Sequence, residues 1–307
     1  MTPSPGPADD DRAQARAFAD DFRRFLDWLH AGEGGRQNEV TGLLRRHLGP
    51  ASGTTSVVSR GFAPFDHVNL QVALDAWAAE PGRAVDVSGL SRPPHFGPLD
   101  LSMLVHGDHL PPVRLSAPDL VDLAVGPDRT LACLQLALLR VTDTRGRYVL
   151  LVRGPQPHED PRLVVEVTGL PTADAQDVLR ELADLRRRLN VYRGQLLELQ
   201  VGPGGVAVAF PQLAPTGRDD VVLPESVLRR VERHTLDMAA RRDDLRAAGQ
   251  HLKRGLLLHG PPGTGKTHTT RYVVQHLPGT TVLLLSGRSL HLVGEVTQLA
   301  RDLQPAV

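Results

Sequence analysis

Glycine, lysine and threonine recur, at a spacing suited to holding phosphate groups, in one stretch near the C-terminal end of the chain. The stretch is Gly260–Thr267, GPPGTGKT, which matches the pattern G-x-x-x-x-G-K-[ST]. Its glycines allow backbone conformations that a Cβ would forbid, so that several N–H groups can face one anion. The lysine would reach the β- and γ-phosphates, and the threonine hydroxyl would bind Mg²⁺. The pattern therefore predicts a P-loop that binds ATP together with Mg²⁺.

Nine consecutive residues are expected to surround the phosphates of this nucleotide. A helix that begins near Lys266 would add the positive end of its dipole to the same site. Thr267 is the predicted ligand of Mg²⁺. The predicted contacts are Gly260, Pro261, Pro262, Gly263, Thr264, Gly265, Lys266, Thr267 and His268.

The segments that flank the P-loop have the patterns of the elements that should position it. Before it, Gly255–His259 is a short apolar run that predicts a buried strand. After it, His268–Leu277 predicts a helix with Tyr272 and Val273 on its inner face, ended by a Pro-Gly pair. Thr281–Ser286 then predicts a second buried strand. Strand, P-loop, helix and strand would form one βαβ unit with a parallel sheet.

The composition is that of an ordinary globular protein. The chain has 307 residues, 41% of them hydrophobic and 23% charged, which suggests about two domains. A net charge of zero gives no support for nucleic acid or an anionic membrane as a partner. Cys133 is the single cysteine, which excludes an internal disulfide and fits a reducing compartment. With no signal-peptide pattern and no apolar run of ~18 residues, we expect a cytoplasmic protein.

Residues 1–50 predict a disordered tail followed by a helical hairpin. Residues 1–8 are proline-rich, and a helix is expected to follow from Asp9. The apolar face of this helix consists of Phe18, Phe22, Phe25, Leu26 and Leu29. A second helix is predicted over Gln37–Leu48. The apolar seam of the hairpin would pack on the next domain or serve as a docking element.

Residues 51–215 predict an α+β domain, for which one hypothesis is the recognition of a partner. Its strands are expected to be mostly antiparallel, with a hairpin turn at Asp143–Gly146. The predicted strands are Leu134–Thr142, Tyr148–Val152, Leu163–Thr168, Gln195–Val201 and Val206–Phe210, and the predicted helices are Asn69–Ala79 and Pro171–Leu189.

Two clusters in this domain admit more than one interpretation. His95, His106 and His109, with Asp108 between the last two, are able to bind a metal, although loop histidines at irregular spacing favour solvated surface. Arg186–Arg188 end the second predicted helix, where their charge suits its dipole. They would form a solvated face or, alternatively, bind an acidic partner.

Residues 216–307 are predicted to begin a P-loop module, after a linker over residues 211–220. A helix from Pro224 would carry the apolar residues Val227, Leu228, Val231 and Met238. Its charged residues, Arg229, Arg230, Glu232 and Arg233, would face outward. The predicted fold class is thus α/β: an N-terminal helical hairpin plus an α+β domain, followed by the start of a parallel αβα module.

From Val221 to about Ser286 the chain resembles the AAA family of ATPases, within the AAA+ group. The residues that carry the resemblance are Arg254–Thr267, RGLLLHGPPGTGKT, together with the helical lead-in from Pro224 and Leu285–Gly287 after the second strand. The lead-in is similar to the Bcs1-type branch. The resemblance implies a ring of identical subunits, usually a hexamer, with ATP at subunit interfaces. It also implies ATP-driven remodelling of a protein substrate, whose identity it leaves unknown, and an adenine pocket near Val221–Leu223.

The chain departs from the family pattern in two places. It ends at Gln304–Val307, where the acidic Walker B strand should begin, and sensors, arginine finger and helical lid are missing too. We therefore interpret the chain as a fragment whose catalytic residues are unknown and which binds nucleotide with little or no turnover. Arg288–Glu295, where many family members carry an aromatic pore loop, has no aromatic residue.

Two other functions compete with an AAA-type ATPase. One is another P-loop enzyme, such as a kinase. The other is a nucleotide-sensing binding module, in which residues 1–210 recognise a partner and the P-loop only senses nucleotide.

Overall fold

The computed structural model describes residues 21, 24, 39–50, 55–92, 97–106, 113–156, 160–202 and 205–307. The first predicted N-terminal helix lies outside the described residues, apart from two positions. His95, Asp108 and His109 lie outside them as well, whereas His106 is the last residue of a short helix.

The described residues form a mixture of helices and strands, with five strands in succession over residues 114–168 and four α-helices in succession before the last strand. The α-helices are α2 (Glu39–Leu48), α3 (His67–Ala78), α4 (Leu101–His106), α5 (Thr172–Arg188), α6 (Glu225–His234), α7 (Leu236–Ala240), α8 (Arg242–Ala247), α9 (Lys266–His276) and α10 (Val293–Asp302). The 3₁₀ helices are η2 (Pro64–Asp66), η3 (Arg218–Asp220) and η4 (Gly287–Leu292). The strands are β1 (Val58–Phe62), β2 (Ala84–Ser91), β3 (Arg114–Ser116), β4 (Asp119–Gly126), β5 (Arg129–Asp143), β6 (Gly146–Arg153), β7 (Leu163–Thr168), β8 (Leu196–Gly202), β9 (Gly205–Ala209) and β10 (Val282–Leu284).

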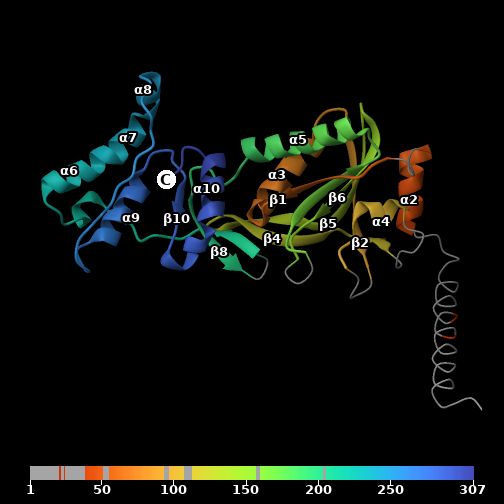
Figure 1. Cartoon of the computed structure of the whole chain (residues 1–307), viewed down its shortest axis with the longest axis horizontal. Helices are drawn as coiled ribbons and strands as arrows, with labels where there is room; N and C mark the ends of the chain where they lie inside the picture. Colours follow the sequence, from red (N-terminus) through yellow and green to blue (C-terminus); the bar gives the residue numbers. More distant parts are fainter. Residues whose placement is uncertain are drawn as a thin grey trace, which may run out of the picture.

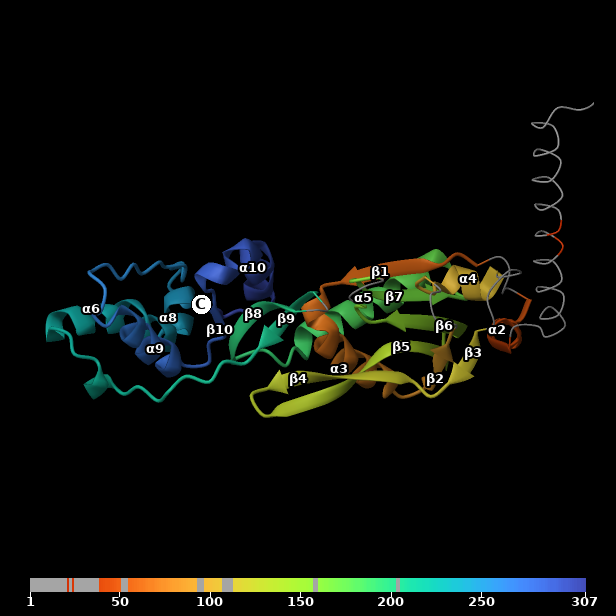
Figure 2. The same ribbon diagram turned by 90° about the horizontal axis from the view of Figure 1, so that it is seen from below.

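An antiparallel sheet of seven strands forms one end of the molecule (Figures 1 and 2). Its order is β1-β7-β6-β5-β2-β3, with β4 paired to the first half of β5. The predicted hairpin is confirmed, because β5 and β6 pair from Leu136↔Arg153 to Asp143↔Gly146. Strand β7 has the predicted bounds.

Helices cover both faces of this sheet, and the side chains of β6 show why. Tyr148 and Leu150 point to the face covered by α3 and α5, whereas Val149 and Leu151 point to the face covered by α2 and α4. Successive side chains of a strand alternate between faces, so a strand that is apolar throughout requires a cover on each side. The apolar face of α2 therefore packs on this sheet.

A smaller sheet lies between the two ends of the molecule (Figure 2). In it β10 pairs parallel to β8, and β8 pairs antiparallel to β9. Strands β8 and β9 precede residue 215 and β10 follows it, so this sheet crosses the predicted boundary between the second and third regions. The division into residues 1–50, 51–215 and 216–307 thus stays a prediction.

The core beside the smaller sheet also joins early and late segments. Phe65, Tyr192 and Leu197 pack there with Val296 and Leu299 of α10. The buried charge pair of Arg186 and Asp66 adds to it. The middle of the molecule is therefore built from segments far apart in the sequence.

Arg186 does not lie on a solvated face, so that prediction is wrong for this residue. Its guanidinium is paired with the buried carboxylate of Asp66, and its Nη2 donates to Asp302 of α10 at 3.2 Å. Burial raises the pKa of Asp66, against the opposing effect of Arg186. Arg187 and Arg188 are exposed, as predicted.

The predicted strand before the P-loop is not formed, and this corrects the sequence analysis. Residues 251–260 have no regular structure, and Leu257 is 87% exposed. A strand needs a neighbour for its N–H and C=O groups. The edges of β10 are occupied by β8 and by the chain end, where Leu283 N donates to Val307 O at 2.8 Å. Among the described residues, no strand is left to pair with Gly255–His259.

Candidate nucleotide-binding site

The P-loop turns directly into helix α9. Gly265 is the N-cap of α9 with φ of 80°, and Gly263 has φ of 79°. Both values lie in the left-handed region, which a residue with a Cβ rarely adopts. The first turn of a helix leaves its N–H groups without intrahelical acceptors, so the start of α9 offers several donors to an anion.

Lys266 folds back over the loop. Its Nζ donates to Gly260 O at 2.8 Å and to Pro261 O at 2.6 Å, while Thr264 Oγ1 donates to Pro261 O at 2.9 Å. In the described part of the chain, no carboxylate forms an ion pair with Lys266. The ammonium is therefore held over the loop by neutral carbonyl groups. Anionic phosphate oxygens accept stronger hydrogen bonds from an ammonium than neutral carbonyl oxygens do.

Helix α9 is fixed from its inner side. Thr269 is 2% exposed, and its Oγ1 donates to Gly265 O at 3.0 Å. Tyr272 and Val273 are buried, as the helical pattern predicted. They pack against Val221, Leu228 and Val231 of the lead-in to the P-loop, with Leu258 at the edge of the same cluster, so that the lead-in contacts both the helix and the segment that enters the loop.

The structure brings the nine predicted residues together as one loop and helix start, but it leaves most of them exposed. Thr267 is the second residue of α9 and exposed, on the turn where a hydroxyl can meet a phosphate-bound cation. Among the described residues there is no group of three or more His, Cys, Asp or Glu side chains that could hold a metal ion. In the described part of the chain, no helix is long and apolar enough to cross a membrane.

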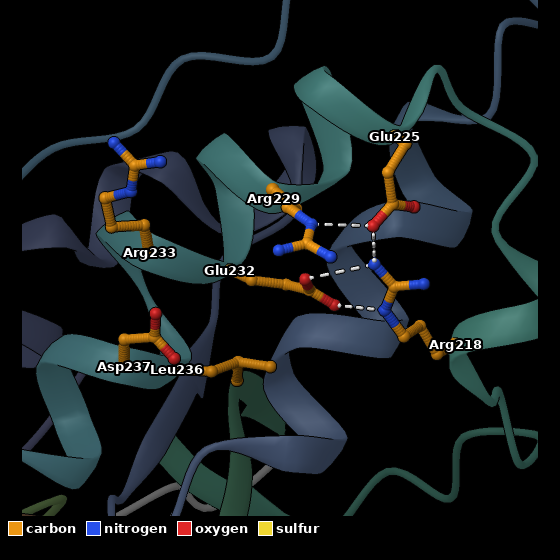
Figure 3. A pocket seen from close by; sticks show the side chains of 7 residues that line it. All are labelled: Arg218, Glu225, Arg229, Glu232, Arg233, Leu236 and Asp237. Carbon is orange, nitrogen blue, oxygen red and sulfur yellow. Dashed lines mark hydrogen bonds and ion pairs between the residues drawn. The ribbon is translucent and has the colours of Figure 1, made fainter.

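A charged cluster beside α9 is the feature that sequence reasoning missed (Figure 3). Glu232 was predicted to face outward, yet its side chain is only 17% exposed. It accepts hydrogen bonds from Tyr272 Oη at 2.8 Å and from Arg218 Nε at 2.9 Å. Glu225 and Glu232 are seven residues apart and thus share one face of α6, which is the signal that could have revealed the cluster.

Comparisons with known proteins agree with this geometry. Residues 256–305 match the AAA family, the ATPase family associated with various cellular activities. The chain is similar to the peroxisomal ATPase PEX6 of Kluyveromyces lactis, with 26% identity over 139 residues that cover 43% of this chain and 13% of the relative. It is also similar to the proteasome-activating nucleotidase of Thermococcus kodakarensis, with 26% identity over 177 residues that cover 45% of each chain.

The chain thus spans less than half the length of these relatives. The matched segment begins at Leu256 and includes the whole P-loop, Gly260–Thr267. The P-loop segment of this chain is thus similar to the AAA family of ATPases.

Proposed function

We propose that this chain binds ATP with Mg²⁺ at Gly260–His268 and that the whole protein hydrolyses ATP to remodel protein substrates. The single observation that carries the binding proposal is the position of the Lys266 ammonium over the loop. The left-handed glycines and the start of α9 support it, because the first turn of a helix leaves backbone N–H groups available to an anion.

Hydrolysis requires groups beyond the P-loop. A carboxylate must help to hold Mg²⁺ and orient the attacking water. Among the described residues, no acidic side chain hydrogen-bonds Thr267 or Lys266. We therefore propose that the chain alone binds nucleotide with little or no turnover, and that its catalytic residues are supplied elsewhere in the assembled protein.

The proposed partners are further copies of the chain and a protein substrate. The names of the relatives support this, since one is called an activator of the proteasome and the other an ATPase of the peroxisome. We propose a ring, of hexameric order, with ATP at subunit interfaces. A cytoplasmic location without nucleic-acid or membrane partners stays part of the proposal, supported by the zero net charge and the single buried cysteine.

A nucleotide-sensing binding module remains the second candidate. The AAA match favours neither this module nor another P-loop enzyme such as a kinase. Turnover by the assembled protein separates the two candidates, because a sensing module would bind ATP without hydrolysing it.

The proposal is tested with Lys266→Ala and a fluorescent ATP analogue in the presence of Mg²⁺. We expect the affinity to fall at least ~100-fold, because a cationic hydrogen-bond donor to the phosphates is lost from the centre of the site. Lys253→Ala is a matched control, since Lys253 is the other lysine of the chain and is exposed a few residues before the loop. Equal affinities of Lys266→Ala and the unmodified chain would refute the P-loop assignment.

A further inference from the structure

Thr269 anchors the P-loop in the interior of the protein. Within residues 260–270, all of which the structure describes, it is the one buried residue, and the others are half-buried or exposed. Thr269 lies outside the nine residues predicted to contact the nucleotide. Its hydroxyl nevertheless bonds to one of them, Gly265, and this bond has so far been given no role in binding.

Side-chain packing does not hold Gly265 in place. A Cβ on this residue would meet no atom within 4 Å beyond its chain neighbours. Its φ of 80° lies in the left-handed region, and glycine loses more conformational freedom on folding than any other residue. The conformation of Gly265 therefore depends on its hydrogen bonds.

Thr269 donates two hydrogen bonds to the same oxygen, Gly265 O. The backbone N of Thr269 donates at 2.8 Å, and the side-chain Oγ1 donates at 3.0 Å. The first is the hydrogen bond that opens α9, and helix ends fray. The second comes from a side chain that is 2% exposed, where the low local dielectric strengthens a hydrogen bond and water does not compete for it. The buried hydroxyl thus secures the carbonyl of Gly265.

The carbonyl of Gly265 and the N–H of Lys266 belong to one peptide group. This group is planar and trans, so its C=O and N–H point in opposite directions. A carbonyl held toward the body of α9 therefore aims the Lys266 N–H away from it, beyond the start of the helix. The N–H groups of a first turn have no intrahelical acceptor, and this is the direction from which an anion approaches.

Thr270 makes the same kind of bond one residue later, but in contact with solvent. Its Oγ1 donates to Lys266 O at 3.0 Å, and its side chain is exposed. Water competes for an exposed hydroxyl, so the net contribution of this bond is small. The two threonines differ mainly in burial, which makes Thr270 a control for Thr269.

We propose that Thr269 is a positioning residue for phosphate binding, whose buried hydroxyl fixes the Gly265–Lys266 peptide with its N–H directed at a phosphate oxygen. The inference rests on the proposed function, since it assumes that phosphates bind at the P-loop. Thr269 itself does not touch the ligand. Because its effect is on the phosphates, it is the same for ligands with and without a nucleoside.

The test uses two substitutions of Thr269 and two ligands with Mg²⁺, a fluorescent ATP analogue and inorganic tripolyphosphate that displaces it. Thr269→Val keeps the branched shape and removes the hydroxyl, whereas Thr269→Ser keeps the hydroxyl and removes a methyl group. We expect Thr269→Val to bind both ligands roughly three- to tenfold more weakly, as the loss of one hydrogen bond implies. Thr269→Ser should stay within about twofold of the unmodified chain.

Thermal unfolding of the same variants separates positioning from a merely structural role. Thr269→Ser loses a buried methyl group and should unfold at a lower temperature, whereas Thr269→Val fills the same space and should unfold close to the unmodified chain. Affinity and stability thus change in different variants. The control Thr270→Val should change neither affinity by more than about twofold.

Three results would overturn the positioning role: unchanged affinity of Thr269→Val, an equal loss in Thr269→Ser, or a loss confined to the ATP analogue. Each leaves the P-loop assignment in place, because Lys266→Ala tests that assignment separately. If the unmodified chain binds neither ligand, the proposed function fails and this inference fails with it.

Discussion

Runs of leucine at the two ends of this molecule differ in their exposure to solvent. In β6, Leu150 and Leu151 are fully buried, each on a different face of the seven-stranded sheet. Before the P-loop, Leu256 and Leu257 are 45% and 87% exposed. The local sequences are similar, so the difference lies in their surroundings. Strand β6 has β5 and β7 beside it and helices over both faces, whereas the segment before the P-loop has no paired strand among the described residues.

An apolar run thus predicts where a strand is possible, and the availability of a neighbouring strand decides whether it forms. The backbone groups of a strand form their hydrogen bonds with neighbouring strands, whereas those of a helix bond to each other within the helix. The P-loop helix α9 forms beside the unpaired segment because its hydrogen bonds are internal.

A matched pair of leucine truncations tests this difference in burial. Leu150→Ala should lower the free energy of unfolding by about 2–5 kcal/mol, because it leaves a cavity in a packed core. Leu257→Ala should change it by less than about 0.5 kcal/mol, since little apolar surface is lost from an exposed side chain. Urea unfolding followed by circular dichroism measures both. Similar losses for the two variants would show that the segment before the P-loop is packed after all.

The next largest effect is expected where the two ends meet. Arg186→Ala should cost about 3 kcal/mol, because the buried carboxylate of Asp66 loses its charged partner and α10 loses the contact through Asp302. Arg188→Ala, on an exposed position of the same helix, is the control.

Urea unfolding midpoints compare these two variants, and hydrogen exchange of α10 shows where the change is felt. Unchanged exchange in α10 would mean that Arg186 stabilises only the seven-stranded end and does not join the two regions.

The smallest expected effect is a pH dependence from His67. This side chain is 4% exposed, its Nε2 donates to Leu134 O at 2.8 Å, and burial lowers its pKa. Below about pH 6.5 the imidazole is therefore protonated in the unfolded chain but stays neutral in the folded chain. The free energy of unfolding thus decreases as the pH falls below about 6.5.

For one proton, the slope is at most about 1.4 kcal/mol per pH unit. His67→Gln should remove it, and the exposed His234→Gln should leave it in place. Urea midpoints between pH 7 and pH 5 measure the slope. A slope that is the same in all three proteins would assign it to other groups.

Much of the candidate site was readable from the sequence. The glycines, Lys266 and Thr267 stand at fixed spacing, and the loop they form depends on local backbone angles, with φ near 80° at Gly263 and Gly265. The inner face of α9 followed from helical periodicity, because a helix satisfies its own backbone. In the sheet region, the turn at Asp143–Gly146 was predicted from short-range turn chemistry and the bounds of β7 from an apolar run.

Only the tertiary structure decided the rest, because it depends on contacts between residues far apart in the chain. Sequence alone did not show that β8 would pair with β10, or that Arg186 would turn from the solvent to Asp66 and Asp302. It also placed Glu232 on the outside, since a charged residue on an amphipathic helix is usually solvated. The Tyr272 hydroxyl and the Arg218 guanidinium, brought to it by the packing of α6 on α9, make the inner position favourable. Sequence determined the elements whose backbone hydrogen bonds are local, such as helices and tight turns. Tertiary structure determined the strand pairs and side-chain contacts that need a partner far away in the chain.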